Sequence, residues 1–110
     1  ENMTGKSLVP ILTGKAAPDH HRDFVRCEYY DALKARDGTL ATMYRDRRYK
    51  LVVYHGRDYG ELYDLQEDPD EFDNQWENSA FANIRADLIK RSFDTSVIAM
   101  DRGPRRIGGI

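Results

Sequence analysis

The sequence predicts an α+β fold in which a four-stranded antiparallel sheet is packed by one long C-terminal helix. Four runs rich in aromatic and β-branched residues are separated by short turn-like connections, and a long stretch near the C-terminal end repeats apolar residues at helical spacing. Because parallel strands need crossovers of about a dozen residues or more, the short connections require antiparallel neighbours. A chain of 110 residues is long enough for one domain with a modest core.

Residues 1–22 are expected to be a connecting segment that contains one short helix. Apolar residues surround Pro10 between residues 6 and 13, and Gly14 follows as a stop signal. Residues 15–22 are polar, so we expect them to cross the surface and lead into the first strand.

Four strands are expected, over residues 23–30, 39–44, 49–55 and 61–65. In the first, Val25, Cys27 and Tyr29 alternate with Arg26 and Glu28, which predicts a buried apolar face that holds the cysteine. The second and third are joined by residues 45–48, a connection short enough to form a hairpin.

Two helical segments are expected after the strands. The first is a helix of one or two turns, predicted from Asp68 as N-cap, Pro69 at the first helical position and Glu71 as the end of a capping box. A second, amphipathic helix is predicted over residues 79–100, capped by Asn78 or Ser79. Its apolar positions, all expected on one sheet face, are Phe81, Ile84, Leu88, Ile89, Phe93, Val97 and Met100.

The expected organisation is therefore a connecting segment at 1–22, a folded unit at 23–100 and a tail at 101–110. With 17 basic and 19 acidic residues the chain has a net charge of −2, so neither a nucleic acid nor an anionic membrane is expected as a partner. No apolar run approaches the roughly 20 residues that span a bilayer. The compartment stays open.

The residues form no complete catalytic site. Cys27 is the one cysteine, which excludes an intrachain disulfide and a zinc site built on paired thiolates. The cluster at residues 19–23 and the acidic run at 68–74 lack the spacing of a metal site, and we expect a polar loop and a helix start there. The remaining candidates are His55, Glu28 and Tyr30, which lie near strand ends, where binding residues often occur.

Three segments, in this order, resemble type I sulfatases. Residues 5–14 resemble the G-x-S-L-x-P-L-L-x-G segment of that family, and residues 48–54 resemble its R-x-Y-K-L strand. Residues 60–74 match the signature G-E-L-Y-D-L-x-x-D-P-x-E-x-x-N, which lies near the C-terminus of the family. The signature positions, which we interpret as structural, are Glu61, Leu62, Tyr63, Asp64, Leu65, Asp68, Pro69, Glu71 and Asn74.

The resemblance implies the C-terminal subdomain of an alkaline-phosphatase-like enzyme that hydrolyses sulfate monoesters. It also implies that the formylglycine nucleophile and a calcium-type ion belong to an N-terminal catalytic domain, which would be the main partner of this chain. Cys27 is followed by Glu28 and Tyr29, so it does not match the family's C/S-x-P-x-R motif. Gln75 and Trp76 stand where the family commonly has a leucine, which would affect packing.

Within such an enzyme, His55, Glu28 and Tyr30 are predicted to lie at the rim of the substrate cleft. Two alternatives remain open: a phosphonate or phosphate-ester hydrolase of the same superfamily, and a free-standing interaction module. Apolar faces left uncovered would favour a subdomain over a free-standing module, and could make the isolated chain self-associate.

Overall fold

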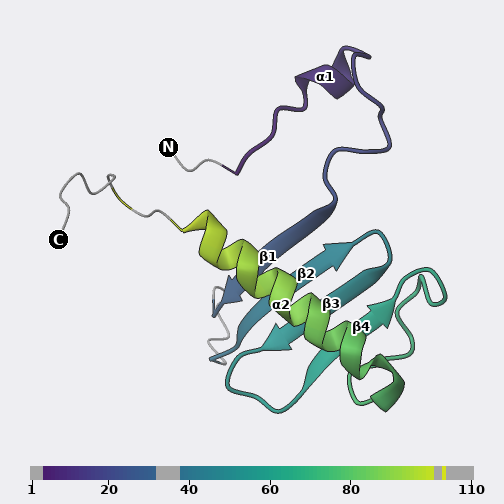
Figure 1. The fold of residues 1–110 in the computed structure, drawn as a ribbon, viewed down its shortest axis with the longest axis vertical. Coiled ribbons are helices and arrows are strands. Elements are labelled where there is room, and N and C mark those ends of the chain that lie inside the picture. Colours follow the sequence, from purple (N-terminus) through teal and green to yellow (C-terminus); the bar gives the residue numbers. More distant parts are fainter. Residues whose placement is uncertain (1–3, 32–37, 101–102, 104–110) are drawn as a thin grey trace.

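The structure, a computed structural model, describes residues 4–31, 38–100 and 103. Its elements are α1 (Val9–Leu12), β1 (Phe24–Tyr30), β2 (Leu40–Asp46), β3 (Tyr49–Tyr54), β4 (Gly60–Asp64), a 3-10 turn η1 (Ser79–Phe81) and α2 (Ala82–Ala99). The strands form one sheet of order β1-β2-β3-β4, with every neighbouring pair antiparallel, and α2 lies across it (Figure 1). The predicted fold class is confirmed.

The predicted short helix is also confirmed as α1, which carries Pro10 in its first turn. Gly14 ends it with a positive φ of 69°, a conformation that a glycine adopts without steric cost. This helix lies away from the sheet (Figure 1). Within the described residues, no helix is long and apolar enough to cross a membrane. The predicted tail falls outside the described residues except for Gly103.

The core lies between α2 and the face of the sheet that α2 covers. Tyr44, Leu51 and Leu62 occupy one cross-strand row, and each is at most 3% exposed. Leu88 of α2 packs on them, with Trp76 and Ile84 partly buried around the cluster. A core of this size supports the fold that the strand pattern predicts.

The prediction that Cys27 lies buried on the core face is wrong, because its side chain is exposed. In the strand register, Arg26 pairs with Tyr44 and therefore shares the helix-covered face, whereas Cys27 pairs with Met43 on the reverse face. The alternating pattern of Val25, Cys27 and Tyr29 is present, but this apolar side is turned away from α2.

The prediction that the apolar residues of the helix all pack on the sheet is wrong for its second half. Leu88 and Ser92 are the buried residues of α2, whereas Phe93 is 68% exposed. Beside Ser92 the sheet presents Arg26, whose Nε donates to the serine Oγ at 3.3 Å. The stripe Ile89, Phe93, Val97 and Met100 lies at least 39% exposed. Asn78 caps the start of the predicted segment, because its side chain accepts the Ala80 N–H, but that start is the 3-10 turn η1. The α-helix itself begins at Ala82 and has no side-chain cap.

The predicted helix at residues 68–71 is wrong, because this segment forms a turn. Glu71 has a φ of 60°, which an α-helix does not tolerate, and its carboxylate pairs with Lys50 of β3 at 2.5 Å. Asp68 accepts the N–H of Asp73 at 2.8 Å, so it stabilises the turn and does not cap a helix.

Asn74 and Gln75 then form an edge staple on β4. The Asn74 Oδ1 accepts the Leu62 N–H at 3.0 Å, its Nδ2 donates to the Gly60 carbonyl at 3.0 Å, and the Gln75 N–H donates to the Leu62 carbonyl at 2.7 Å. An exposed edge strand carries unpaired N–H and C=O groups that invite pairing with another chain. The staple therefore satisfies the outer edge of the sheet, which gives the signature residue Asn74 a structural role.

Candidate functional site

The three predicted rim residues lie at one edge of the helix-covered sheet face. β1 and β3 run in the same direction because each is antiparallel to β2. Tyr30 at the end of β1 and His55 just after β3 therefore lie at the same end of the sheet, which we call the rim edge. Glu28 shares its face with Tyr30 two residues later, and its cross-strand partner on β2 is Thr42. The structure thus brings Glu28, Tyr30 and His55 together, and all three are exposed.

Glu28 is the charged centre of this group. Its Oε1 accepts a hydrogen bond from Arg26 Nη1 at 2.5 Å, and the Tyr30 hydroxyl also bonds to it. These two hydrogen bonds lower the pKa of Glu28, and the bond to the carboxylate raises the pKa of Tyr30. At neutral pH the pair is therefore a carboxylate acceptor beside a phenol donor, suited to binding hydroxyl groups.

His55 is held in place by two contacts to β2. Its backbone N–H donates to the Leu40 carbonyl at 2.8 Å, and its Nε2 lies 2.7 Å from the Thr42 Oγ1. Thr42 is only 4% exposed, so the ring is anchored from below, and His55 itself is exposed. Among the described residues none bonds to the Nδ1 of His55, and an imidazole nitrogen can donate to or accept from a ligand.

Sequence reasoning missed Arg26 and Thr42 as members of this group. Arg26 was predicted on the outward face of β1, but its i, i+2 spacing to Glu28 places both on the same face of a strand. That spacing was the available signal. Thr42 had none, because its contact with His55 depends on the register between β2 and β3.

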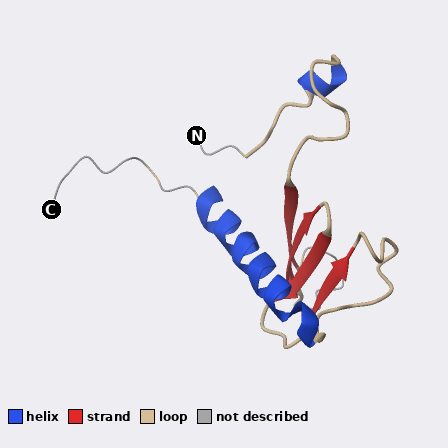
Figure 2. Cartoon of the chain, turned by 45° about the vertical axis from the view of Figure 1, so that its right-hand side comes forward, coloured by secondary structure: helices blue, strands red, loops and turns tan. Residues whose placement is uncertain are grey.

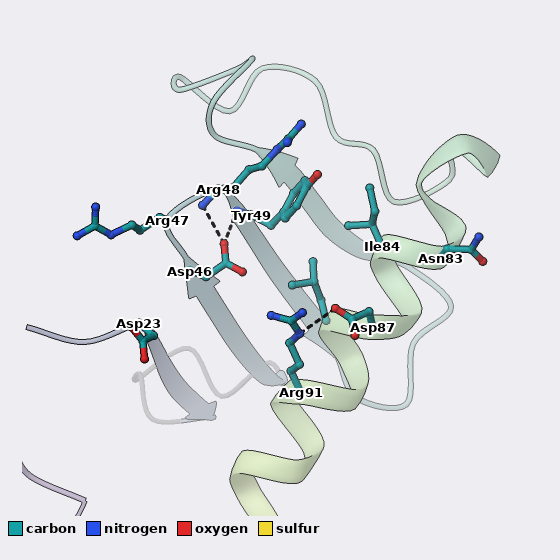
Figure 3. Close-up of a pocket in the computed structure, with 10 residues that line it drawn as sticks. Asp23, Asp46, Arg47, Arg48, Tyr49, Asn83, Ile84, Asp87 and Arg91 are labelled. Atoms are coloured by element: carbon teal, nitrogen blue, oxygen red, sulfur yellow. Dashed lines mark hydrogen bonds and ion pairs between the residues drawn. The ribbon is translucent and has the colours of Figure 1, made fainter. Parts of the chain in front are cut away.

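A groove lies at the opposite end of the same face (Figure 3). It has a volume of about 550 Å³ and lies between α2 and the turn that joins β2 to β3. Arg91 pairs with Asp87 at 2.8 Å, and Asp46 accepts the N–H groups of Arg48 and Tyr49 at 2.8 and 2.7 Å. Because its charges are compensated by neighbours, the groove has no built preference for an anion.

Neither region holds a hydrolytic centre. The thiol of Cys27 is on the reverse face of the sheet, away from His55 and Glu28. Within the described part of the chain, no group of three or more His, Cys, Asp or Glu side chains is placed to hold a metal ion. At the polar cluster of residues 19–23, His20 contacts Asp23 at 3.4 Å and Arg47 at 3.0 Å, which ties the segment to the β2–β3 turn. The chemistry that Glu28, Tyr30 and His55 offer is hydrogen bonding.

Comparison with known proteins decides the family. The model of the family described as N-sulphoglucosamine sulphohydrolase, C-terminal, matches residues 1–97. The chain belongs to this family. The resemblance to the C-terminal region of sulfatases, drawn from residues 5–14, 48–54 and 60–74, is thereby confirmed. A search of curated proteins finds no match to the sequence.

Solved structures agree with this sulphohydrolase C-terminal assignment. BT1596, a 2-O GAG sulfatase, is 28% identical with a TM-score of 0.74, over 89% of this chain and 21% of that chain. A phosphonate monoester hydrolase from Silicibacter pomeroyi is 26% identical with a TM-score of 0.71, over 90% of this chain and 22% of that one. A similar hydrolase from Agrobacterium radiobacter is 27% identical with a TM-score of 0.68, over 89% and 21% of the respective chains. The chain thus spans about a fifth of the length of these enzymes.

Proposed function

We propose that this chain is the C-terminal subdomain of an enzyme that hydrolyses sulfate monoesters, and that its nucleophile and metal belong to a catalytic domain outside the chain. The family match over residues 1–97 carries the proposal. In the complete enzyme, as we call the two parts together, residues 1–22 would connect the domains. Residues 23–100 would form the subdomain, with 101–110 as a tail.

The chemistry of the described residues fits this division. A formylglycine and a calcium-type ion would supply the nucleophile and the charge that binds the sulfate group, both within the catalytic domain. The sheet edge that carries Glu28, Tyr30 and His55 would contribute hydrogen bonds to the rest of the substrate. These three residues would therefore form the substrate rim.

A substrate comparison tests the proposed activity. The complete enzyme would be assayed with an aryl sulfate and with the matching aryl phosphonate monoester. We expect the sulfate ester to have the higher kcat/KM. A higher kcat/KM for the phosphonate ester would instead identify the second candidate, a phosphonate monoester hydrolase, which the likeness to the Silicibacter pomeroyi enzyme supports.

The rim role has its own test. In the complete enzyme, His55→Ala should raise KM for the natural substrate several-fold, because a lost hydrogen bond is worth about 0.5–1.5 kcal/mol. Thr42→Val should have a smaller effect in the same direction, since it removes only the contact that orients the ring. His21→Ala, on the connecting segment, is the control. Unchanged kcat and KM in His55→Ala would remove His55 from the rim.

A further inference from the structure

The face of the sheet that α2 does not cover is apolar across its centre. In the strand register one row runs Cys27, Met43, Val52 and Glu61, and the rows beside it add aromatic and aliphatic side chains. The apolar and aromatic members of this reverse face are Val25, Cys27, Tyr29, Ala41, Met43, Val52, Tyr54 and Tyr63. Its charged positions are Arg45, Lys50 and Glu61.

Two of these charged residues, Lys50 and Glu61, have partners within the chain and lie near the margin of the reverse face. Lys50 pairs with Glu71 at 2.5 Å and lies 5.7 Å from the centre of the Tyr63 ring. Glu61 accepts the hydroxyl hydrogen of Tyr54 at 2.6 Å. The reverse face therefore has the make-up of a protein interface, an apolar centre with a hydrogen-bonded polar rim.

Among the described residues, no helix or strand lies over this face. Figure 2 shows α2 on one side of the sheet only. A sheet with one wet face alternates apolar and polar residues, whereas a sheet that is apolar on both faces is buried between two layers. Val25 is 47% exposed and Cys27 is exposed, so the described residues supply no second layer on this face.

We propose that the reverse face docks on the catalytic domain of the same enzyme. This rests on the proposed function. The length of related proteins indicates which partner covers the reverse face. This chain spans about 21% of the related sulfatase chain, so the rest of such a chain is available to pack against it. A domain tethered in the same chain has a far higher effective concentration than a second molecule. The docking surface should be apolar, with an acidic group opposite Arg45, which is exposed on this face.

The apolar stripe of α2 is the weaker docking site. It is a single line of residues, Ile89, Phe93, Val97 and Met100, beside charged neighbours that include the ion pair of Lys90 with Asp94 at 2.5 Å. The reverse face, in contrast, is continuous over all the strands.

Thiol labelling in the complete enzyme tests the proposal. Cys27 lies in the central row and is the one cysteine of this chain, so it reports directly on the cover of this face. Its rate of reaction with N-ethylmaleimide would be followed by mass spectrometry of its peptide and divided by the rate in denatured enzyme. Arg57→Cys, in the exposed loop between β3 and β4, is the matched control, and Phe93→Cys reports on the stripe of α2.

We expect Cys27 to react at least about 100-fold more slowly than the cysteine of Arg57→Cys. Labelling of Cys27 within about threefold of that control would overturn the proposal, and protection of Phe93→Cys instead would assign the docking surface to α2. Hydrolysis of sulfate esters is measured separately. A protected Cys27 in an enzyme without sulfatase activity would overturn the proposed function and leave the interface standing.

Discussion

Replacement of Asn74 tests whether the family signature holds the sheet together. The Asn74 side chain makes three hydrogen bonds of 3.0 Å, to the N–H groups of Leu62 and Trp76 and to the Gly60 carbonyl. A hydrogen bond contributes about 0.5–1.5 kcal/mol net, and the lower half of that range applies because Asn74 is an exposed residue. We therefore expect Asn74→Ala to lower the free energy of unfolding by about 2 kcal/mol.

Urea unfolding followed by tryptophan fluorescence measures this change directly. Trp76 is the one tryptophan of the chain and lies beside the substituted position, so its signal reports on the edge staple. For a domain of this size about 2 kcal/mol corresponds to a fall in Tm of roughly 10 °C. Glu77→Ala, at an exposed position, is the control and should change stability by less than about 0.5 kcal/mol. A loss equally small in Asn74→Ala would refute the structural role of the staple.

Three further substitutions have definite outcomes. The Arg48 guanidinium lowers the pKa of Asp64 in the folded protein. The pair therefore stabilises the fold above about pH 4, and this stabilisation is lost as the pH falls through the folded-state pKa of Asp64. In Asp64→Asn the free energy of unfolding should fall less steeply as the pH is lowered. The hydrogen bond to Glu61 raises the pKa of Tyr54 to about 12. Its full contribution to the free energy of unfolding is present below about pH 10 and is lost as the pH rises towards 12. In an ultraviolet titration Glu61→Gln should therefore lower that pKa, and an unchanged value would contradict the assignment. Leu88→Ala should cost about 2–5 kcal/mol in urea unfolding, because Leu88 is 2% exposed in the core.

The strand order and the long helix could be predicted because their signals are local. Short connections allow only antiparallel neighbours, and asparagine is a preferred N-cap residue. The face of each strand could not be assigned in the same way. Val25, Cys27 and Tyr29 alternate correctly, but alternation within one strand does not say which of its two faces the helix covers, because that depends on the neighbouring strands.

The two wrong expectations at the helices have the same origin. Glu71 has the position of a capping-box residue, but its pairing with Lys50 on another element places its backbone at a φ that no helix accepts. Phe93 has helical spacing to Ile89, but Arg26 and Ser92 occupy the space on the sheet side. In both cases the structure depends on contacts between residues that are distant in the sequence, and a local sequence pattern does not predict such contacts.

The candidate site was predictable in part. Strand-end position pointed to Glu28, Tyr30 and His55, which the structure places at one edge of the sheet. The anchoring of His55 by Thr42 needs the register of two strands and could not be read in advance. Whether these residues touch a substrate is a prediction for the complete enzyme.

Hydrolysis measured on the complete enzyme and on the 110-residue chain, side by side with an aryl sulfate, tests the central claim most directly. The claim that this chain is the non-catalytic C-terminal subdomain of a sulfatase predicts turnover by the complete enzyme and none by the chain alone. Turnover by the isolated chain, or a complete enzyme inactive on every sulfate ester, would contradict it.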